Sequence, residues 1–199
     1  MTKHIDYYFA TISPWTYLGH DRLVSIAHKH GATIAVKPVN FGEVFPASGG
    51  LPLSKRAPQR QAYRLVELKR WSEFLGAPIN LRPRYFPANG DLAAYWVLAA
   101  AENDSAQALA LYGAIGKALW VEEGDIADAA TLSAVARRLG QDAEALGARA
   151  QAPEISARYA ALTKEAIDRG VFGAPSYLVD GELFWGQDRL DFLDRKLAK

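Results

Sequence analysis

The sequence contains no cysteine among its 199 residues. This absence excludes disulfides and cysteine-ligated metals, and it leaves the chain without a thiol of its own. There is also no excess of one charge, because 23 lysines and arginines face 22 aspartates and glutamates, for a formal net charge of +1. That balance gives no electrostatic reason to expect nucleic acid or an anionic membrane as a partner.

Long hydrophobic runs are missing as well. No apolar stretch reaches the length of a membrane span. The first residues, MTKHIDYYFATISPW, lack the apolar core and small-residue cleavage site of a signal peptide. We therefore expect a cytoplasmic protein with no membrane partner.

The four histidines do not form a metal-ligating pattern. His28 and His30 are two residues apart on a predicted helix and point in different directions, while His4 and His20 belong to no cluster. We expect solvated histidines and no metal site.

The first forty residues predict a β-α-β unit. Residues 5–12 are rich in aromatic and β-branched side chains, as in a buried strand. Ser13 is a good N-cap for a helix that runs to about His30. A second strand is expected over residues 33–41, in which Pro38 indicates a bulge or an edge.

The rest of the chain predicts an irregular loop, a helical block and a C-terminal β-β-α unit. The loop covers residues 42–58, whose glycines and prolines are typical of irregular structure. Strands at 176–179 and 182–185 are joined by the tight turn Asp180-Gly181, and a final helix covers 188–197. The helical block has six segments, at about 59–75, 91–102, 105–120, 129–139, 142–150 and 153–169.

Ser13 is the first candidate functional residue, because a helix N-terminus offers free N–H groups and a positive dipole end to an anion. A serine nucleophile would need a base, and His20 lies seven residues along the same helix, about 10 Å away. No Gly-x-Ser-x-Gly motif is present. On local sequence, a plain N-cap and an anion-binding hydroxyl remain equally good interpretations.

The second candidate lies near the C-terminus, in VFGAPSYLVDGELFWGQDRL. Pro175 suits a cis peptide bond and cannot complete a strand ladder at its own position. The backbone of Ala174 would then be free to pair with an extended peptide. Asp188 offers a carboxylate to an ammonium group, or simply caps the last helix.

These features together resemble the thioredoxin-like proteins of the DsbA type. The more specific similarity is to a glutathione-dependent branch, the kappa-class glutathione transferases and 2-hydroxychromene-2-carboxylate isomerases, in which serine replaces the redox cysteine. The motifs that carry the resemblance are SPWTYLG at 13–19, VFGAP at 171–175 and FWGQDRL at 184–190. The resemblance implies an α/β fold whose thioredoxin-like domain, residues 1–56 and 171–199, holds an all-helical insertion at 57–170.

The resemblance also implies roles for particular residues. Ser13 would hydrogen-bond the glutathione sulfur and Ala174 would pair with the cysteinyl backbone. Arg60 stands where the family usually has a lysine near glutathione. The γ-glutamyl end would be held by Trp185, Gly186, Gln187 and Asp188. The positions implied for an aromatic substrate are Ser54, Lys55 and Tyr85.

Two departures from the family pattern concern the substrate more than glutathione. Ala10 replaces an acid that is common in the first strand, and Gly49-Gly50 stand where an asparagine is usual. Lys55 suits a substrate carboxylate, although an exposed loop lysine is usually just solvated. Trp15, Tyr85 and Phe86 suit an aromatic pocket or the core, and for Phe86 we favour the core.

The function implied by the resemblance is a glutathione-dependent isomerase acting on a small aromatic carboxylate. The substrate pair of such enzymes is 2-hydroxychromene-2-carboxylate and trans-o-hydroxybenzylidenepyruvate, from aromatic hydrocarbon breakdown. The alternatives are a kappa-class-like transferase that conjugates electrophiles, and a non-catalytic peptide-binding module. Members of this family commonly form homodimers.

Overall fold

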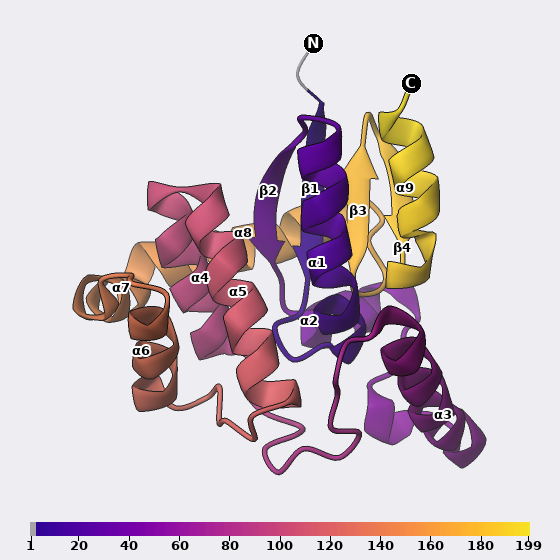
Figure 1. Cartoon of the computed structure of the whole chain (residues 1–199), viewed down its shortest axis with the longest axis horizontal. Helices are drawn as coiled ribbons and strands as arrows, with labels where there is room; N and C mark the ends of the chain where they lie inside the picture. Colours follow the sequence, from indigo (N-terminus) through magenta and orange to yellow (C-terminus); the bar gives the residue numbers. More distant parts are fainter. Residues whose placement is uncertain (1–2) are drawn as a thin grey trace.

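A four-stranded mixed sheet forms the centre of the protein, for which the computed structural model describes residues 3–199 (Figure 1). The order of strands is β2-β1-β3-β4, and β1 is parallel to β2 while β3 is antiparallel to β1 and β4. All four strands correspond to predicted ones, although the first ends at Phe9 and not at residue 12. Their bounds are β1 His4–Phe9, β2 Thr33–Pro38, β3 Ser176–Val179 and β4 Glu182–Trp185.

Strand β1 has core on both of its faces because its side chains alternate. Ile5, Tyr7 and Phe9 enter the larger hydrophobic cluster, while Tyr8 enters a smaller one on the opposite face. Pro38 ends β2, which is an edge strand, as a residue without an amide hydrogen should.

Helices cover both faces of the sheet. All six segments of the predicted helical block are present, with ends within two residues of the expected ones. The bounds are α1 Pro14–Lys29, α2 Phe41–Ser48, α3 Pro58–Leu75, α4 Asp91–Asn103, α5 Ser105–Trp120, α6 Ala129–Arg138, α7 Ala143–Ala150, α8 Pro153–Asp168 and α9 Leu190–Leu197, with 3-10 turns η1 Leu53–Lys55 and η2 Gln187–Arg189.

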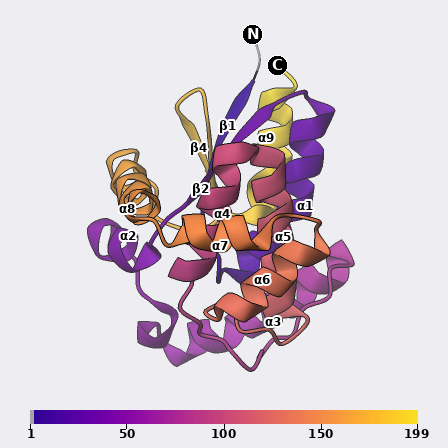
Figure 2. The ribbon, with the colours of Figure 1, turned by 90° about the vertical axis from the view of Figure 1, so that its left-hand side faces the viewer.

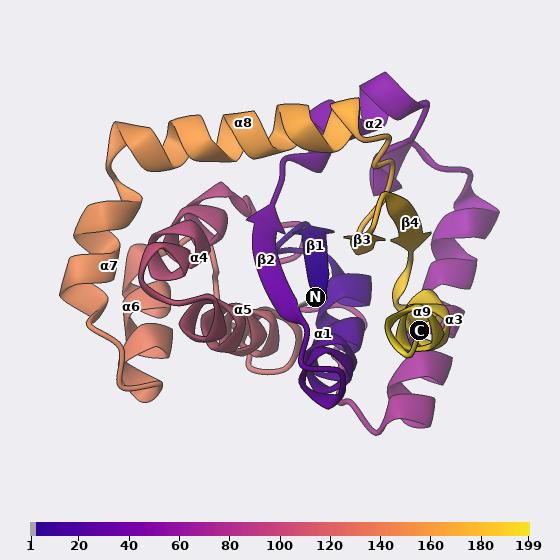
Figure 3. The same cartoon turned by 90° about the horizontal axis from the view of Figure 1, so that it is seen from above.

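The helices divide between the two sides of the molecule. Seen from above, α2 and α8 lie on one face of the sheet, and α1 and α9 lie on the other (Figure 3). Helices α4 to α7 form a group beside β2, whereas α3 lies on the opposite side, near α9 (Figures 1 and 3). Side chains of α4 and α5 share one continuous cluster with β1 and β2, so the group is packed onto the sheet (Figure 2).

The prediction of an irregular loop over residues 42–58 is wrong for its first half, most of which forms helix α2. Asn40 caps this helix by accepting a hydrogen bond from the Gly42 N–H at 2.9 Å. Phe41 and Val44 lie one turn apart and are buried, and Gly49 ends the helix with φ 73°. The sequence predicted a loop because the prolines and glycines of this segment are more conspicuous than its short apolar repeat. The same helix cuts the second strand short at Pro38.

Two of the four histidines are not solvated, contrary to expectation. His20 is 4% exposed and its Nε2 lies 3.0 Å from the Leu109 carbonyl oxygen. His30 lies 2.5 Å from Asp194 with a side chain only 12% exposed. Burial lowers the pKa of His20, so at neutral pH it is a neutral core residue.

No helix among residues 3–199 is long and apolar enough to cross a membrane.

Candidate active site

One row of paired residues brings the two candidate motifs to the same end of the sheet, which we call the sheet edge. Ser176 is paired with Tyr8 on one side and with Trp185 on the other. The end of β1, the start of β3 and the end of β4 therefore meet there. Ser13 follows β1 and Ala174 precedes β3, so residues from opposite ends of the chain converge at this edge (Figure 1).

Ser13 is the N-cap of α1, and its cap bond leaves a donor free. Its Oγ accepts a hydrogen bond from the Thr16 N–H at 3.2 Å, and its own N–H donates to the Ala10 carbonyl at 3.0 Å. A hydroxyl that accepts through its oxygen still has its hydrogen to donate. Capping and anion binding, which were alternatives on sequence grounds, are therefore compatible in this geometry.

The loop between α3 and α4 is fastened to α1 and to the segment before it. The Tyr17 hydroxyl donates to the Pro78 carbonyl at 2.8 Å, and the Thr11 hydroxyl donates to the Gly90 carbonyl at 2.9 Å. Gly90 packs so closely on Thr11 that a side chain at this position would collide with it. The loop, residues 76–90, is thus held at both ends beside Ser13.

Ala174 presents unpaired backbone, as the sequence predicted. The Ala174–Pro175 peptide bond is cis. The ladders to β1 and β4 both stop at Ser176, and among residues 3–199 no partner takes up the N–H or C=O of Ala174. The Ser176 hydroxyl donates to the Gly173 carbonyl at 2.7 Å and fixes this turn from inside.

Residues 185–188 follow the same edge but differ in what they expose. The Trp185 ring is 50% exposed and lies against Phe172, with ring centroids 4.8 Å apart. Gly186 has φ 101°, a conformation that favours glycine. Asp188 is exposed inside the 3-10 turn and pairs with Arg189 at 2.8 Å, so it does not cap a helix.

Gln187 is the member of this group that is least accessible to a ligand. It is 2% exposed, and the Arg22 guanidinium donates to its carbonyl and side-chain oxygens at 3.2 and 3.3 Å. A side chain at Gly19 would collide with it, so α1 and η2 are in close contact at this point. Gln187 fixes the position of its neighbours.

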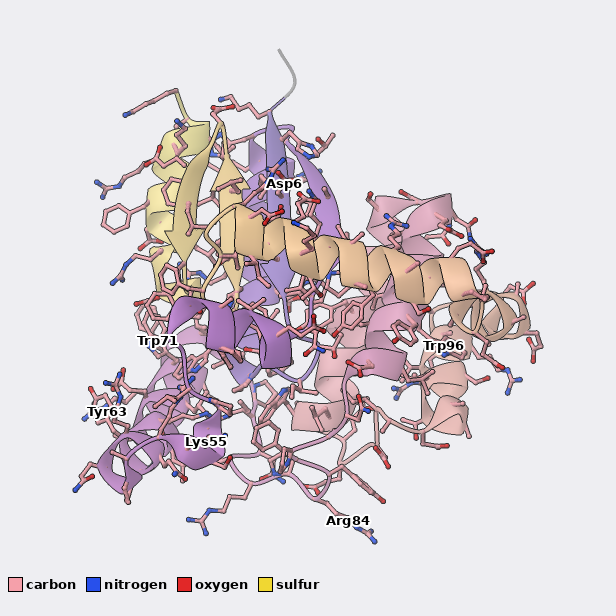
Figure 4. The ribbon with its side chains drawn as sticks, turned by 180° about the vertical axis from the view of Figure 1, so that it is seen from behind. Asp6, Lys55, Tyr63, Trp71, Arg84 and Trp96 are labelled. Carbon is pink, nitrogen blue, oxygen red and sulfur yellow. The ribbon has the colours of Figure 1, made fainter. Side chains whose placement is uncertain are left out.

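The residues implied for the substrate lie on a different part of the chain. Ser54 and Lys55 are exposed in η1, and Arg60 is exposed in the first turn of α3. Tyr85 is half-buried in the loop before α4, with the Arg84 guanidinium 5.2 Å from its ring centroid. Figure 4 shows Lys55 and Arg84 in its lower half, on the side of the molecule that carries the loop.

Sequence reasoning missed Arg64, a half-buried residue of α3. Its guanidinium lies 5.3 Å from the ring centroid of Phe86, and Phe86 itself packs on Trp120 of the core. Burial, and then the charge of nearby Arg56, lower the pKa of Arg64 to about 10. The signal was an excess of basic residues between 49 and 90, which the balanced charge of the whole chain concealed.

No cluster of three or more histidine, cysteine, aspartate or glutamate side chains within residues 3–199 has the arrangement of a metal site.

The sheet order and the helical group between β2 and β3 define a thioredoxin-like protein. The chain belongs to the family of DSBA-like thioredoxin domains, whose model matches residues 4–198. The predicted α/β, thioredoxin-like fold is confirmed.

Proteins similar to this chain include a named group of isomerases. The 2-hydroxychromene-2-carboxylate isomerase of Sphingobium xenophagum is 33% identical over 99% of both chains. A solved 2-hydroxychromene-2-carboxylate isomerase has a TM-score of 0.80 at 30% identity, over 98% of this chain and 94% of its own. The cytosolic disulfide reductase DsbM of Pseudomonas aeruginosa, solved with GSH, shares the fold at 19% identity, with a TM-score of 0.71 over 98% of this chain and 100% of its own.

Proposed function

We propose that this protein is a glutathione-dependent isomerase that interconverts 2-hydroxychromene-2-carboxylate and trans-o-hydroxybenzylidenepyruvate. The observation that carries the proposal is the free hydroxyl hydrogen of Ser13 at the N-terminus of α1, beside the unpaired backbone of Ala174. Support for the substrate comes from the isomerases that resemble the chain over nearly their whole length.

The residues at the sheet edge suit glutathione, a small peptide with a thiol, two carboxylates and an ammonium group. The backbone of Ala174 offers a donor and an acceptor to an extended peptide. Asp188 offers an exposed carboxylate to an ammonium group. When bound, glutathione supplies the thiol that this cysteine-free chain lacks, as a thiolate that adds reversibly to the conjugated double bond of the substrate.

Ser13 favours the thiolate over the thiol. A free thiol has a pKa of about 8.5, and lowering it by about two units requires roughly 2.7 kcal/mol of differential stabilisation. One hydrogen bond donated to a charged acceptor contributes about 1.5–3 kcal/mol, and a helix N-terminus adds about 0.3–1 kcal/mol. The two contributions reach the required magnitude without a general base.

The substrate would lie between Ser13 and the loop of residues 76–90. Tyr85 offers an aromatic face and a hydroxyl from this loop. Ser54 and Lys55 offer exposed polar groups from η1, and Arg60 offers a cation from the first turn of α3. These residues would bind and orient the substrate, while the proton and thiol chemistry would take place at the sheet edge.

Replacing Ser13 with alanine tests the proposal. We expect the pKa of the bound thiol to rise by one to two units, and the isomerisation rate at pH 7 to fall about 10- to 100-fold. Thiolate absorbance in the ultraviolet measures the first effect independently of turnover. Ser13→Thr should retain most activity, because it keeps the hydroxyl.

Two controls separate this role from helix capping. Ser13→Asp keeps an acceptor for the N–H groups of α1 but has no proton to donate, so it should be as inactive as alanine. Ser25→Ala, an exposed position on the same helix, should leave rate and pKa unchanged. An unchanged pH–rate profile in Ser13→Ala would remove Ser13 from the mechanism.

Product analysis tests the transferase alternative. A glutathione conjugate that accumulates in proportion to the glutathione consumed would make the protein a transferase.

A further inference from the structure

Most basic residues between positions 49 and 90 have no acidic partner within residues 3–199. This segment holds eight lysines and arginines but only two acidic residues, in a chain of net charge +1. Both acids are already paired within α3, Glu67 with Arg70 and Glu73 with Lys69. Among residues 3–199, no carboxylate pairs with the other six cations, which are Lys55, Arg56, Arg60, Arg64, Arg82 and Arg84.

Arg64 differs from the other five because it is both enclosed and unsatisfied. It is half-buried, and none of its guanidinium N–H groups has an acceptor within residues 3–199. Arg56 is also half-buried, but its Nε donates to the Leu51 carbonyl at 2.8 Å. Lys55 and Arg60 are exposed. A cation withdrawn from water without an acceptor is costly, and a bound anion would offset that cost.

The guanidinium of Arg64 has an aromatic ring as its neighbour and not a hydrogen-bond acceptor. The guanidinium lies over the Phe86 ring, with the carbon 5.3 Å from the centroid. A guanidinium over an aromatic ring can still donate in its own plane and suits a carboxylate in a bidentate pair. The repulsion from Arg56 strengthens the attraction of this position for a negative group.

The helix that carries Arg64 contacts the helix that Ser13 caps. Phe86 belongs to the loop of residues 76–90, which is fastened to Tyr17 and Thr11 on either side of Ser13. Helix α3, which carries Arg64, packs against α1, which begins after Ser13. Arg64, Phe86 and Ser13 therefore belong to segments that contact one another, because α3 packs on α1 and the loop that carries Phe86 is tied to α1 and to Thr11.

We propose that Arg64 binds the carboxylate of the substrate, with its ring partner Phe86 forming part of the aromatic surface. This assignment rests on the proposed isomerase function and adds a specificity-determining residue to it. Lys55, the residue suggested by sequence, then makes at most an exposed and weaker contact. The carboxylate of the glycyl end of glutathione has the same chemistry, and the experiment distinguishes the two sources.

The test uses trans-2-hydroxycinnamate, an aromatic ring with a conjugated double bond and a carboxylate, as a non-reacting probe. Its affinity is measured by calorimetry on the full chain with glutathione present. Arg64→Gln should weaken binding of this probe about 10- to 100-fold, the effect of losing a charge-assisted hydrogen bond. Arg64→Lys should recover part of the affinity. The methyl ester of the probe should bind wild type and Arg64→Gln equally.

The matched control is Arg70→Gln, which removes the same charge from an exposed position of the same helix. It should leave probe affinity unchanged. Equal probe affinities in wild type, Arg64→Gln and Arg64→Lys would overturn the assignment. So would a loss of glutathione affinity in Arg64→Gln with probe binding intact, because the carboxylate would then be that of glutathione. Failure of the wild type to isomerise its substrate would instead refute the proposed function.

Discussion

Two clusters of charge in this protein are built in opposite ways. On the α8 side of the sheet, Lys37 Nζ lies 2.7 Å from both Asp6 and Glu165, and Arg169 lies 2.7 Å from Asp6. The Tyr8 hydroxyl donates to Glu165 at 2.6 Å. In the second cluster, the basic residues of segment 49–90, six of the eight cations have no carboxylate partner within residues 3–199. Figure 4 shows Asp6 of the first cluster in its upper half and Lys55 and Arg84 of the second in its lower half.

The first cluster holds charges that stabilise the fold, whereas the second holds charges that are proposed to bind a ligand. In the first cluster every buried charge has its opposite within the protein, so no group there gains from binding an outside ion. In the second, Arg64 is partly shielded from water and has no anionic partner within residues 3–199. Removing a charge should therefore affect stability in the first cluster and affinity in the second.

The largest effect on stability is expected for Lys37→Met. Lys37 is only 14% exposed and is shared by two carboxylates, so its loss leaves Asp6 and Glu165 enclosed without their main cation. We expect a loss of about 3 kcal/mol in the free energy of unfolding, measured by urea denaturation. Lys69→Met, which removes an exposed partner of Glu73 on α3, should cost less than about 0.5 kcal/mol. Equal losses would erase the contrast between the clusters.

The same cluster should make stability depend on pH. Burial opposes ionisation of Asp6 and Glu165, but the hydrogen bond and charge of Lys37 hold the pKa of both carboxyls below the ordinary value. A carboxyl with a lowered pKa in the folded state stabilises the fold above its unfolded pKa of about 4, and this contribution disappears as the pH falls through the folded pKa. Wild type should therefore lose stability between about pH 5 and pH 2.

Lys37→Met should show a smaller loss across that acid range, because its carboxyls are no longer held ionised. Urea denaturation at a series of pH values measures both curves. Parallel curves for the two proteins would mean that other carboxylates produce the acid sensitivity.

The smallest effect is expected where charges are paired but exposed. Arg149 holds Glu102 through two nitrogens at 2.6 and 2.9 Å, and its side chain is 39% exposed. Arg149→Met should cost less than about 1 kcal/mol, since water replaces much of the interaction. The thermal midpoint, compared with that of Lys37→Met, measures the difference. A cost as large as that of Lys37→Met would show that pairing alone, and not enclosure, sets the energy.

Most of the fold was readable from local patterns. Ser13-Pro14 and Asp180-Gly181 have strong chemical preferences for a helix start and a tight turn, and both are confirmed. Helix α2 was missed because Pro46 and the glycines after it favour a loop, whereas Asn40 and the buried Phe41 form a helix start.

The site was only partly readable, because its parts depend on tertiary contacts. The free hydroxyl of Ser13 follows from the single acceptor bond that its oxygen makes, and no sequence pattern reveals that. The isolation of Arg64 follows from its enclosure beside Phe86, which lies 22 positions away in the numbering. His20 and His30 were misjudged for the same reason, since distant residues bury or pair them.

The two tethers of the loop between α3 and α4 have an evolutionary consequence. Because hydrogen bonds at Pro78 and Gly90 fix both ends, exposed residues between them, such as Arg82 and Arg84, can be exchanged while Ser13 keeps its place. Under the proposed function, selection could change the choice of substrate through these positions without altering the residues proposed to hold glutathione. A library confined to the exposed positions within residues 79–89 is accordingly a sensible starting point for engineering new specificities on this scaffold.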